Sequence, residues 1–436
     1  RRQRQMCIRD RYRYVLNEGD KMKTILFVSP TGTLDNGAEI SIVNLMKFLA
    51  AEGYHVVNAA PIYGVATEND YSRYCESNGI ECYLINNQRW WWEDAPAHIF
   101  GSEEERVVSY RDTIKTLTEI IKEKQVDVVI TNTVNMFQGA LASCLESIPH
   151  IWLIHEYPEK EFAYYKNKLD FIDQFSTDIF SVTGDLNNHL NKLFNSREIL
   201  PFAPYTELKS SNIQIGKKKR IVSVGRITKR KNQLELIRAF HEINRKDIEL
   251  VFVGGWDEEY KRECERYIKE HTIASVSFTG NVENPWDIVT DKDICVFTSS
   301  LETYGLVYVE ALLNGIPVII SDNPGHLSAY EMFQHGKIYP LGNIDSLVEA
   351  INYFIDNFEE VKSKSEMFIK TAKEKYQIKS VYHVLIERIN QAKTNEHAIR
   401  HIKNLLVINE KKSKLANLEI KIRTFVQRVM YKIKNK

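Results

Sequence analysis

Short, nearly continuous apolar runs alternate with longer stretches of helical periodicity along most of the chain. TILFVS and HVVNAA flank the helix-like EISIVNLMKFLAAEG, and VDVVIT at 126–131 and HIWLI at 150–154 each precede another helix-like stretch. Apolar strands separated by helices are typical of a parallel sheet that is covered on both faces. The pattern therefore predicts a doubly wound α/β domain over residues 22–202.

The alternation stops at a polar, turn-rich stretch and then begins again. RIVSVG, IELVFVGG, SVSFTG, DICVFTS and PVIIS are the strand-like runs of the second part, with helical stretches between them. We predict a linker at 203–219, a second Rossmann-like domain at 220–375, a crossover helix at 376–394 and a basic amphipathic tail at 395–436. Two such domains enclose a cleft at the carboxyl ends of their strands, where ligands bind.

Composition excludes several classes of protein. Lys+Arg and Asp+Glu both number 58 in the 436 residues, so no overall basic field indicates a nucleic-acid partner. The six cysteines form no C-x-x-C pair, which argues against a zinc site or a disulfide framework and fits a reducing cytoplasm. No apolar run approaches the roughly 18 residues that a membrane span needs.

The two ends of the chain are basic. Residues 1–21 contain RQRQMCIRDR, which resembles the spurious translation of adapter DNA, and Met22 looks like a natural start. We expect 1–21 to be a non-native or disordered leader. In the tail, Leu415, Leu418, Ile422 and Phe425 begin an apolar face, as in a helix that lies on an inner-membrane surface. A helix packed on a partner subunit or on the domain itself, or a frayed tail, is the alternative.

The stretch ETYGLVYVE places two glutamates around a strand-to-helix turn. A buried strand precedes Glu302, and a helix is expected to begin just after Gly305, with Glu310 about one turn inside it. The free N–H groups and the positive dipole at such a helix start favour an anion, most naturally a phosphate. The alternative is a pair of solvated glutamates that the helix dipole favours there.

Cations occur at a second strand-to-helix junction, SVGRITKRKN. Gly225 and Arg226 follow a strand and Lys231 begins the next helix, which suits a diphosphate held by a guanidinium fork and a point charge. We expect Lys229 and Arg230 to be a solvated basic turn.

Two junctions in the first domain carry weaker signals. Asn36 and Gly37 lie where a glycine turn meets a helix, and His155 and Glu156 end a buried strand on the cleft side. Turns of this kind often only satisfy backbone geometry, and a histidine after a strand is often a structural hydrogen-bonder, so both alternatives stay open.

Together these motifs resemble the retaining glycosyltransferases of the GT4 family, which have the two-domain GT-B fold, over about residues 22–390. The resemblance implies that Glu302 contacts the donor sugar, that Glu310 binds the nucleotide ribose, and that Arg226 and Lys231 form the family's R-x4-K clamp. It also implies that His155 touches the sugar, that the glycine turns at Gly37 and Gly225 border the donor, and that a backbone segment holds the diphosphate: Tyr304, Gly305, Leu306 and Val307.

The chain departs from the family pattern at three places. Asn36 replaces the first glycine of the G-G-A-E loop, while Gly37, Ala38 and Glu39 fit. Asn232 stands where many members have glycine, and SDNPGHLSAY lacks the G-G-x-x-E that some members show. We therefore carry no role over to the SDNPGHLSAY segment.

Two further stretches admit rival interpretations. Asp291 and Asp293 form a D-x-D, but they precede a buried strand and so belong to the wrong end of the sheet for the cleft; we interpret them as structural. The aromatic run Trp90–Trp92 is either an acceptor contact or a packed loop. We expect neither a metal nor another cofactor.

The resulting hypothesis is a cytoplasmic, bacterial, metal-independent retaining hexosyltransferase, peripheral at the inner face of the membrane. It would move a sugar from a nucleotide-sugar donor to a hydroxyl of a surface polysaccharide or lipid-linked glycan. Arg226, Lys231 and backbone N–H groups would stabilise the leaving diphosphate, and Glu302 would orient the sugar without acting as a nucleophile. A nucleotide-sugar epimerase and a non-catalytic partner subunit are the alternatives.

Overall fold

The computed structural model describes residues 22–34, 37–62, 67–85, 103–208, 213–393 and 396–406. The leader 1–21, Asn36, the run Trp90–Trp92 and residues 407–436 of the tail lie outside the described residues. In the described part, no helix is long and apolar enough to cross a membrane.

The first domain is built on a parallel sheet with the strand order β3-β2-β1-β4-β5-β6-β7. Its strands are β1 (Thr24–Val28), β2 (His55–Pro61), β3 (Ile80–Ile85), β4 (Val128–Asn132), β5 (His150–Ile154), β6 (Asp178–Val182) and β7 (Leu200–Phe202). Its helices are α1 (Gly37–Ala51), α2 (Thr67–Ser77), α3 (Glu103–Glu123), α4 (Gln138–Glu146), α5 (Leu169–Gln174) and α6 (Asp185–Leu193), with a 3₁₀ segment η3 (Lys160–Lys168). β1, β4 and β5 are buried along their whole length, as their continuous apolar runs predict.

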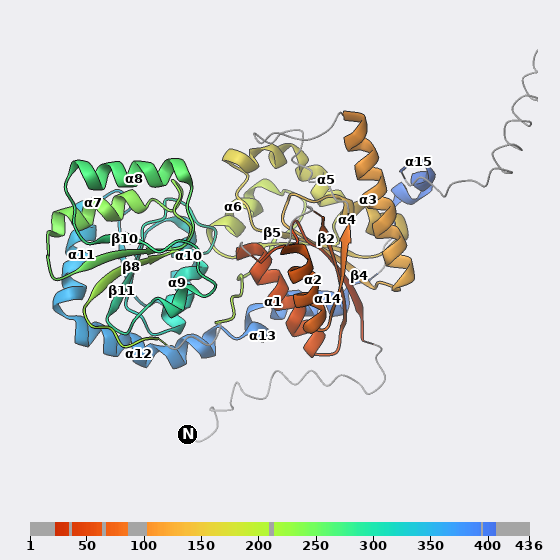
Figure 1. Ribbon diagram of the computed structural model, residues 1–436. Coiled ribbons are helices and arrows are strands. Elements are labelled where there is room, and N and C mark those ends of the chain that lie inside the picture. The colour runs from red at the N-terminus through yellow and green to blue at the C-terminus, as the bar shows by residue number, and fades with distance from the viewer. Residues whose placement is uncertain are drawn as a thin grey trace, which may run out of the picture.

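The second domain repeats this design with the strand order β10-β9-β8-β11-β12-β13. Its strands are β8 (Arg220–Val224), β9 (Glu249–Val253), β10 (Val276–Phe278), β11 (Asp293–Phe297), β12 (Val318–Ser321) and β13 (Lys337–Tyr339). Its helices are α7 (Gln233–Ile243), α8 (Glu258–Glu270), α9 (Leu306–Leu313), α10 (Pro324–Phe333), α11 (Ile344–Asp356) and α12 (Phe358–Lys375), with a 3₁₀ segment η4 (Pro285–Asp287). The predicted architecture of two doubly wound Rossmann-like domains is confirmed (Figure 1).

The strand order reverses once in each sheet, between β1 and β4 and between β8 and β11. On either side of such a reversal, the loops after the strands go to opposite faces of the sheet. A crevice forms between these loops at the carboxyl ends of the strands, and doubly wound sheets bind their ligands there. The motifs singled out in the sequence follow β1, β5, β8 and β11. The topology therefore gathers them at the mouth between the domains.

The end of the chain returns from the second domain to the first. After α12, the helices α13 (Ile378–Val381) and α14 (His383–Gln391) lie along the first domain, and η5 (Ala398–Ile402) and α15 (Lys403–Leu406) follow (Figure 1). Tyr382 Oη lies 2.5 Å from Ser41 Oγ, and Lys23 Nζ donates to the Ile389 carbonyl at 2.9 Å. A stretch of chain that follows the second domain is thus hydrogen-bonded to the first.

Candidate functional site

The anion site predicted at the start of α9 is formed as the sequence indicates. Gly305 caps the helix with φ +77°, a conformation that glycine adopts without a steric penalty. The N–H groups of Leu306 and Val307 lie in the first turn, where no intrahelical acceptor exists. Tyr304 contributes only its backbone here, because its side chain is buried and its hydroxyl lies 3.5 Å from Met332 Sδ.

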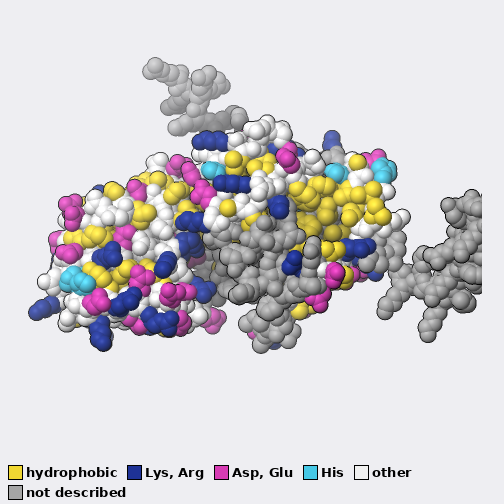
Figure 2. All heavy atoms as spheres, turned by 90° about the horizontal axis from the view of Figure 1, so that it is seen from above, with side chains coloured by type: hydrophobic (Ala, Val, Ile, Leu, Met, Phe, Trp, Pro, Cys, Tyr) yellow, Lys and Arg dark blue, Asp and Glu magenta, His cyan; other side chains and the backbone are white. Residues whose placement is uncertain are grey.

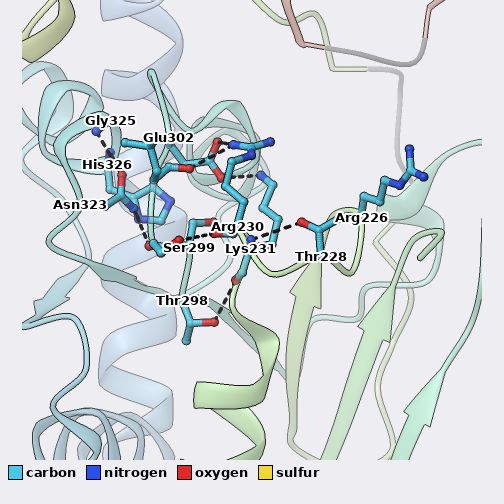
Figure 3. Close-up of polar contacts among 12 residues, drawn as sticks. Arg226, Thr228, Arg230, Lys231, Thr298, Ser299, Glu302, Asn323, Gly325 and His326 are labelled. Carbon is cyan, nitrogen blue, oxygen red and sulfur yellow. Dashed lines mark hydrogen bonds and ion pairs between the residues drawn. The ribbon is translucent and has the colours of Figure 1, made fainter. Parts of the chain in front are cut away.

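Glu302 lies buried beside this helix start and is held by two cations. Its Oε1 lies 2.6 Å from Lys231 Nζ, and its Oε2 accepts from Arg230 Nη1 at 2.9 Å (Figure 3). Burial raises the pKa of the Glu302 carboxyl, but the charges of Lys231 and Arg230 outweigh that effect and bring it to about 2. The carboxylate is therefore ionised at neutral pH.

Arg230 is half-exposed, as expected of a solvated turn residue, but it is also ion-paired, which was not predicted. Its guanidinium donates to Glu302 Oε2 at 2.9 Å and to the Leu301 carbonyl at 3.0 Å, and so bridges the β8–α7 loop to the loop after β11. The sequence shows a run of three cations and does not show which of them contacts the carboxylate.

Arg226 and Lys231, which the resemblance pairs as one clamp, are not together in this structure. Lys231 extends to Glu302, whereas Arg226 is exposed and extends away from the cluster (Figure 3). Gly225 (φ +137°) lies next to the Lys231 side chain, because a Cβ on this glycine would be 4.0 Å from Lys231 Nζ. The neighbouring Asn232 has a left-handed backbone (φ 54°), which asparagine tolerates, so its replacement of glycine is physically accounted for.

Glu310 has neutral partners instead of charged ones. Its Oε1 accepts from Thr206 Oγ1 at 2.7 Å and its Oε2 from Trp286 Nε1 at 3.0 Å. Burial raises the pKa of Glu310 above its ordinary value. The two glutamates of the motif therefore differ in kind: Glu302 is a fixed anion and Glu310 a hydrogen-bonded acceptor.

On the first domain, His155 lies at the end of β5 with a neutral ring. Burial lowers the pKa of His155 to about 3, and Nε2 lies 2.8 Å from Asn132 Oδ1. The Asn132 amide is oriented by its contact with the Ala38 carbonyl at 3.4 Å, so Oδ1 faces the ring and Nε2 carries the proton. Nδ1 is then an acceptor.

The next residue, Glu156, is a second buried carboxyl. Burial and, to a smaller extent, the nearby Glu39 carboxyl raise its pKa to about 8, although the backbone N–H groups of Val134 and His155 donate to Oε2 and lower it. A carboxyl with that pKa holds its proton at pH 7 and can donate as well as accept.

Elements of both domains meet at the site. A Cβ on Gly37, the first residue of α1, would lie 3.1 Å from Leu306 Cδ1. At a second contact the Asp185 N–H donates to Ser328 Oγ at 3.2 Å, so that α6 touches α10. The glycine turn of the first domain therefore faces the helix start of the second.

The D-x-D stretch lies elsewhere. Asp293 begins β11 at its amino end and is paired with Arg220 at 2.6 Å, and Asp291 accepts from the Gly216 N–H at 2.7 Å. Among the described residues, no group of three or more histidine, cysteine, aspartate or glutamate side chains is placed to hold a metal ion.

Sequence reasoning missed several residues that build the site: Asn132, Thr206, Trp286, Arg230, Asn323 and His326. Asn132 could have been found as a polar residue that ends a buried strand. Asn323 could have been found as a cap before Pro324. Thr206 lies in the stretch after β7 and Trp286 in η4, 104 and 24 residues from Glu310 in sequence, and no local pattern marks them.

The second domain is similar in sequence to a known family. Residues 205–375 match the family described as "Glycosyl transferases group 1". The chain is 32% identical over 139 residues to an alpha-monoglucosyldiacylglycerol synthase of Streptococcus pneumoniae, covering 30% of this chain and 31% of the relative. It is 25% identical over 207 residues to a poly(glycerol-phosphate) alpha-glucosyltransferase of Bacillus subtilis, covering 45% and 30%.

The chain thus spans less than two fifths of the length of these curated relatives. Among solved structures, Anabaena HepE in complex with UDP and glucose superimposes with a TM-score of 0.67 at 18% identity, over 85% of this chain and 100% of that one. TarM superimposes with a TM-score of 0.65 at 11% identity, over 85% and 99%. The chain has the GT-B fold of these structures, and its second domain carries the group 1 glycosyltransferase match.

Proposed function

We propose that this protein is a retaining glycosyltransferase that moves a sugar from a nucleotide donor to a hydroxyl of a surface polysaccharide or lipid-linked glycan. The group 1 match over 205–375 supports the reaction class. The observation that carries the proposal is the buried Glu302 carboxylate, clamped by Lys231 and Arg230 beside the start of α9. A cation pair and free helix N–H groups suit a diphosphate, and a carboxylate suits sugar hydroxyls.

In the proposed reaction the bond between the sugar's anomeric carbon and the diphosphate oxygen breaks, and its electron pair stays on the diphosphate. Lys231 and the N–H groups of Leu306 and Val307 stabilise the charge that develops there, which is the largest catalytic contribution expected of such a site. Arg226, which is exposed at the same loop, closes on the diphosphate from outside. No metal is needed where these groups neutralise the phosphates.

Glu302 and His155 act on the sugar. Glu302 is ionised, so it accepts hydrogen bonds from sugar hydroxyls and offsets positive charge on the oxocarbenium-like ring. His155 is neutral with its Nε2 held by Asn132, so its Nδ1 is the atom to which we assign a hydrogen bond from a sugar hydroxyl. The acceptor hydroxyl bonds to the anomeric carbon on the face that the diphosphate leaves, and its proton passes to the departing phosphate oxygen.

The relatives suggest where to begin the search for substrates. HepE holds UDP and glucose, so a UDP-sugar is the first donor to test. The curated relatives are named for a glucosyl lipid and for poly(glycerol phosphate), so a lipid and a polyol phosphate are the first acceptors. Hydrophobic side chains gather on one face of the first domain (Figure 2), which suits an acceptor with a lipid anchor.

The test is a thermal-shift panel of UDP-, GDP- and ADP-sugars on the full chain. A ligand at about 100 times its dissociation constant stabilises a protein by about 2.7 kcal/mol, an easily measured shift. We expect one donor to raise the melting temperature of the parent, and the response to be lost in Glu310→Ala but kept in a matched exposed variant, Glu270→Ala.

Turnover separates the alternatives. Release of nucleoside diphosphate should require an acceptor, for which diacylglycerol vesicles and poly(glycerol phosphate) are the first probes. Glu302→Gln should keep donor binding and lose about 100-fold or more of kcat, because one preorganised charge at the reacting centre is removed. Turnover without an acceptor would show an epimerase, and no response to any nucleotide sugar would leave a non-catalytic subunit.

A further inference from the structure

The side chain of His326, in the first turn of α10, is completely buried against the anion site. One ring nitrogen, Nε2, has no hydrogen-bond partner among the described residues. A Cβ on Gly305 would lie 2.7 Å from His326 Cδ2 and 3.4 Å from Nε2, so this edge of the ring lies directly against the cap of α9. Burying a polar atom without a partner is costly, and such an atom in a site calls for an explanation.

Two glycines, Gly305 and Gly325, allow the close packing that places the His326 ring against the start of α9. A Cβ on Gly325 would lie 2.3 Å from the Glu302 carbonyl carbon and oxygen, so only glycine lets the start of α10 approach Glu302. Asn323 caps α10 through Oδ1, which accepts from the N–H groups of Gly325 and His326 at 3.1 Å each. The cap fixes both the helix start and the orientation of the Asn323 amide.

That orientation determines the tautomer of His326. With Oδ1 facing the backbone, the Asn323 Nδ2 amide faces His326 Nδ1 at 2.7 Å. Two oxygens of Ser321, the carbonyl at 3.1 Å and Oγ at 3.2 Å, also lie near Nδ1 and would favour a proton there. That proton would, however, place two donors opposite each other at the shorter contact with Asn323 Nδ2. Nδ1 therefore accepts from Asn323, and the neutral ring carries its proton on Nε2.

The His326 ring lies next to the Glu302 side chain (Figure 3). Burial lowers the pKa of His326 to about 4, the Glu302 charge raises it and the Lys231 charge lowers it, so both groups act on the ring. The contact of Glu302 Oε1 is the Lys231 ammonium at 2.6 Å. A diphosphate that draws Lys231 to itself would leave Oε1 buried without a partner, at a cost that exceeds that of an ordinary lost hydrogen bond.

We propose that His326 is a positioning residue, whose Nε2–H donates to Glu302 when the diphosphate takes Lys231. The inference rests on the proposed function and extends it to a residue outside the E-x7-E and R-x4-K patterns. The exchange keeps Glu302 ionised and aimed at the sugar while the cation moves to the leaving group. The ring stays neutral throughout.

The test compares two substitutions that replace different ring nitrogens. His326→Gln places an amide near the Nε2 position and keeps a donor there, whereas His326→Asn places its amide near Nδ1 and leaves the Nε2 position empty. We expect kcat to fall about 10- to 100-fold in His326→Asn, the range for one hydrogen bond to a charged group, with the donor KM changed by less than about threefold. His326→Gln should recover most of kcat. Equal losses in both variants, matched by equal drops in melting temperature, would show a purely structural residue and overturn the inference.

A spectroscopic measurement on the parent protein depends neither on turnover nor on whether a variant folds. The ¹⁵N–¹H correlation of the histidine rings should show His326 as the Nε2–H tautomer, and saturating inorganic pyrophosphate should shift its Nε2 signal. The Nδ1–H tautomer, or a signal that pyrophosphate leaves unchanged, would overturn the inference. Failure of every nucleotide sugar to bind, with the pyrophosphate shift present, would instead contradict the proposed function.

Discussion

At the scale of single residues, the candidate site buries ionisable groups in three different ways. Glu302 keeps its charge because two cations contact it, whereas burial raises the pKa of Glu310 and Glu156, which have neutral donors. His155 stays neutral because burial disfavours its charged form. Residues of one type are therefore assigned different chemistry by their contacts.

Glu156 gives a pH-dependent prediction. Its pKa of about 8 exceeds its ordinary value of 4.5, so between these values the folded protein holds a proton that the unfolded chain has lost. The unfolding free energy of the parent should then fall, relative to Glu156→Gln, by up to about 1.4 kcal/mol per pH unit over that window. Chemical denaturation at pH 5 and pH 8 measures the difference. Glu159→Gln, at an exposed neighbour, should show no such trend, and a parent curve parallel to that of Glu156→Gln would contradict the assignment.

At the scale of elements, the sequence predicted most of what is observed, because local signals define these elements. The helix expected after Gly305 runs over Leu306–Leu313, and the strand-like runs RIVSVG and DICVFTS contain β8 and β11. Glycine at the left-handed cap and continuous apolar strands are visible in any single stretch. The strand order follows from the same alternation, since parallel neighbours require crossover helices.

The side chains that complete the site could not be predicted in this way. Spacing identified Arg226 and Lys231, but rotamers place Arg230 instead of Arg226 on Glu302. The contribution of His326 depends on two glycines that let α10 approach Glu302, a tertiary contact between segments about twenty residues apart in the chain. Nothing in the local pattern of either segment reports that approach.

The contact of α6 with α10 gives a prediction at this scale. Gly184 has φ +88°, and a Cβ on it would lie 2.1 Å from Ser328 Oγ and 2.4 Å from Ser328 Cβ. Gly184→Ala should therefore push the two helices apart and lower the melting temperature by more than backbone strain alone. Gly79→Ala is the matched control, since φ is +75° there and its Cβ would meet only Ala50 Cβ at 3.6 Å. Small-angle scattering should show a larger radius of gyration for Gly184→Ala only; equal behaviour of the two variants would mean that the α6–α10 contact does not hold the domains together.

At the scale of the whole molecule, two stretches of chain join the domains. Thr206, just after β7, donates to Glu310 in the second domain, and its N–H donates to Tyr376 Oη at 3.0 Å. The segment after α12 then returns to the first domain, where Tyr382 contacts Ser41 (Figure 1). The residues that contact Glu310 are thus among those that link the domains, so the proposed donor site and the coupling of the domains share contacts.

This coupling predicts how the protein unfolds. Tyr382 is 1% exposed, and its hydroxyl accepts from the Tyr205 N–H at 3.3 Å, so Tyr382→Ala removes a buried ring and the contacts that bridge three segments. Replacing a buried aromatic ring by alanine lowers the unfolding free energy by about 3–5 kcal/mol. Here the lost contacts are those of the segment that joins the two domains. Calorimetry of the parent should show one transition and that of Tyr382→Ala two, because each domain keeps its own sheet and core.

The control is Tyr339→Ala, which removes an equally buried ring whose hydroxyl donates to Glu235 within the second domain. It should lower stability without separating the transitions. If Tyr382→Ala instead melts in one shifted transition like Tyr339→Ala, the domains are coupled through the cleft contacts of Thr206 and Gly37 and not through the returning segment.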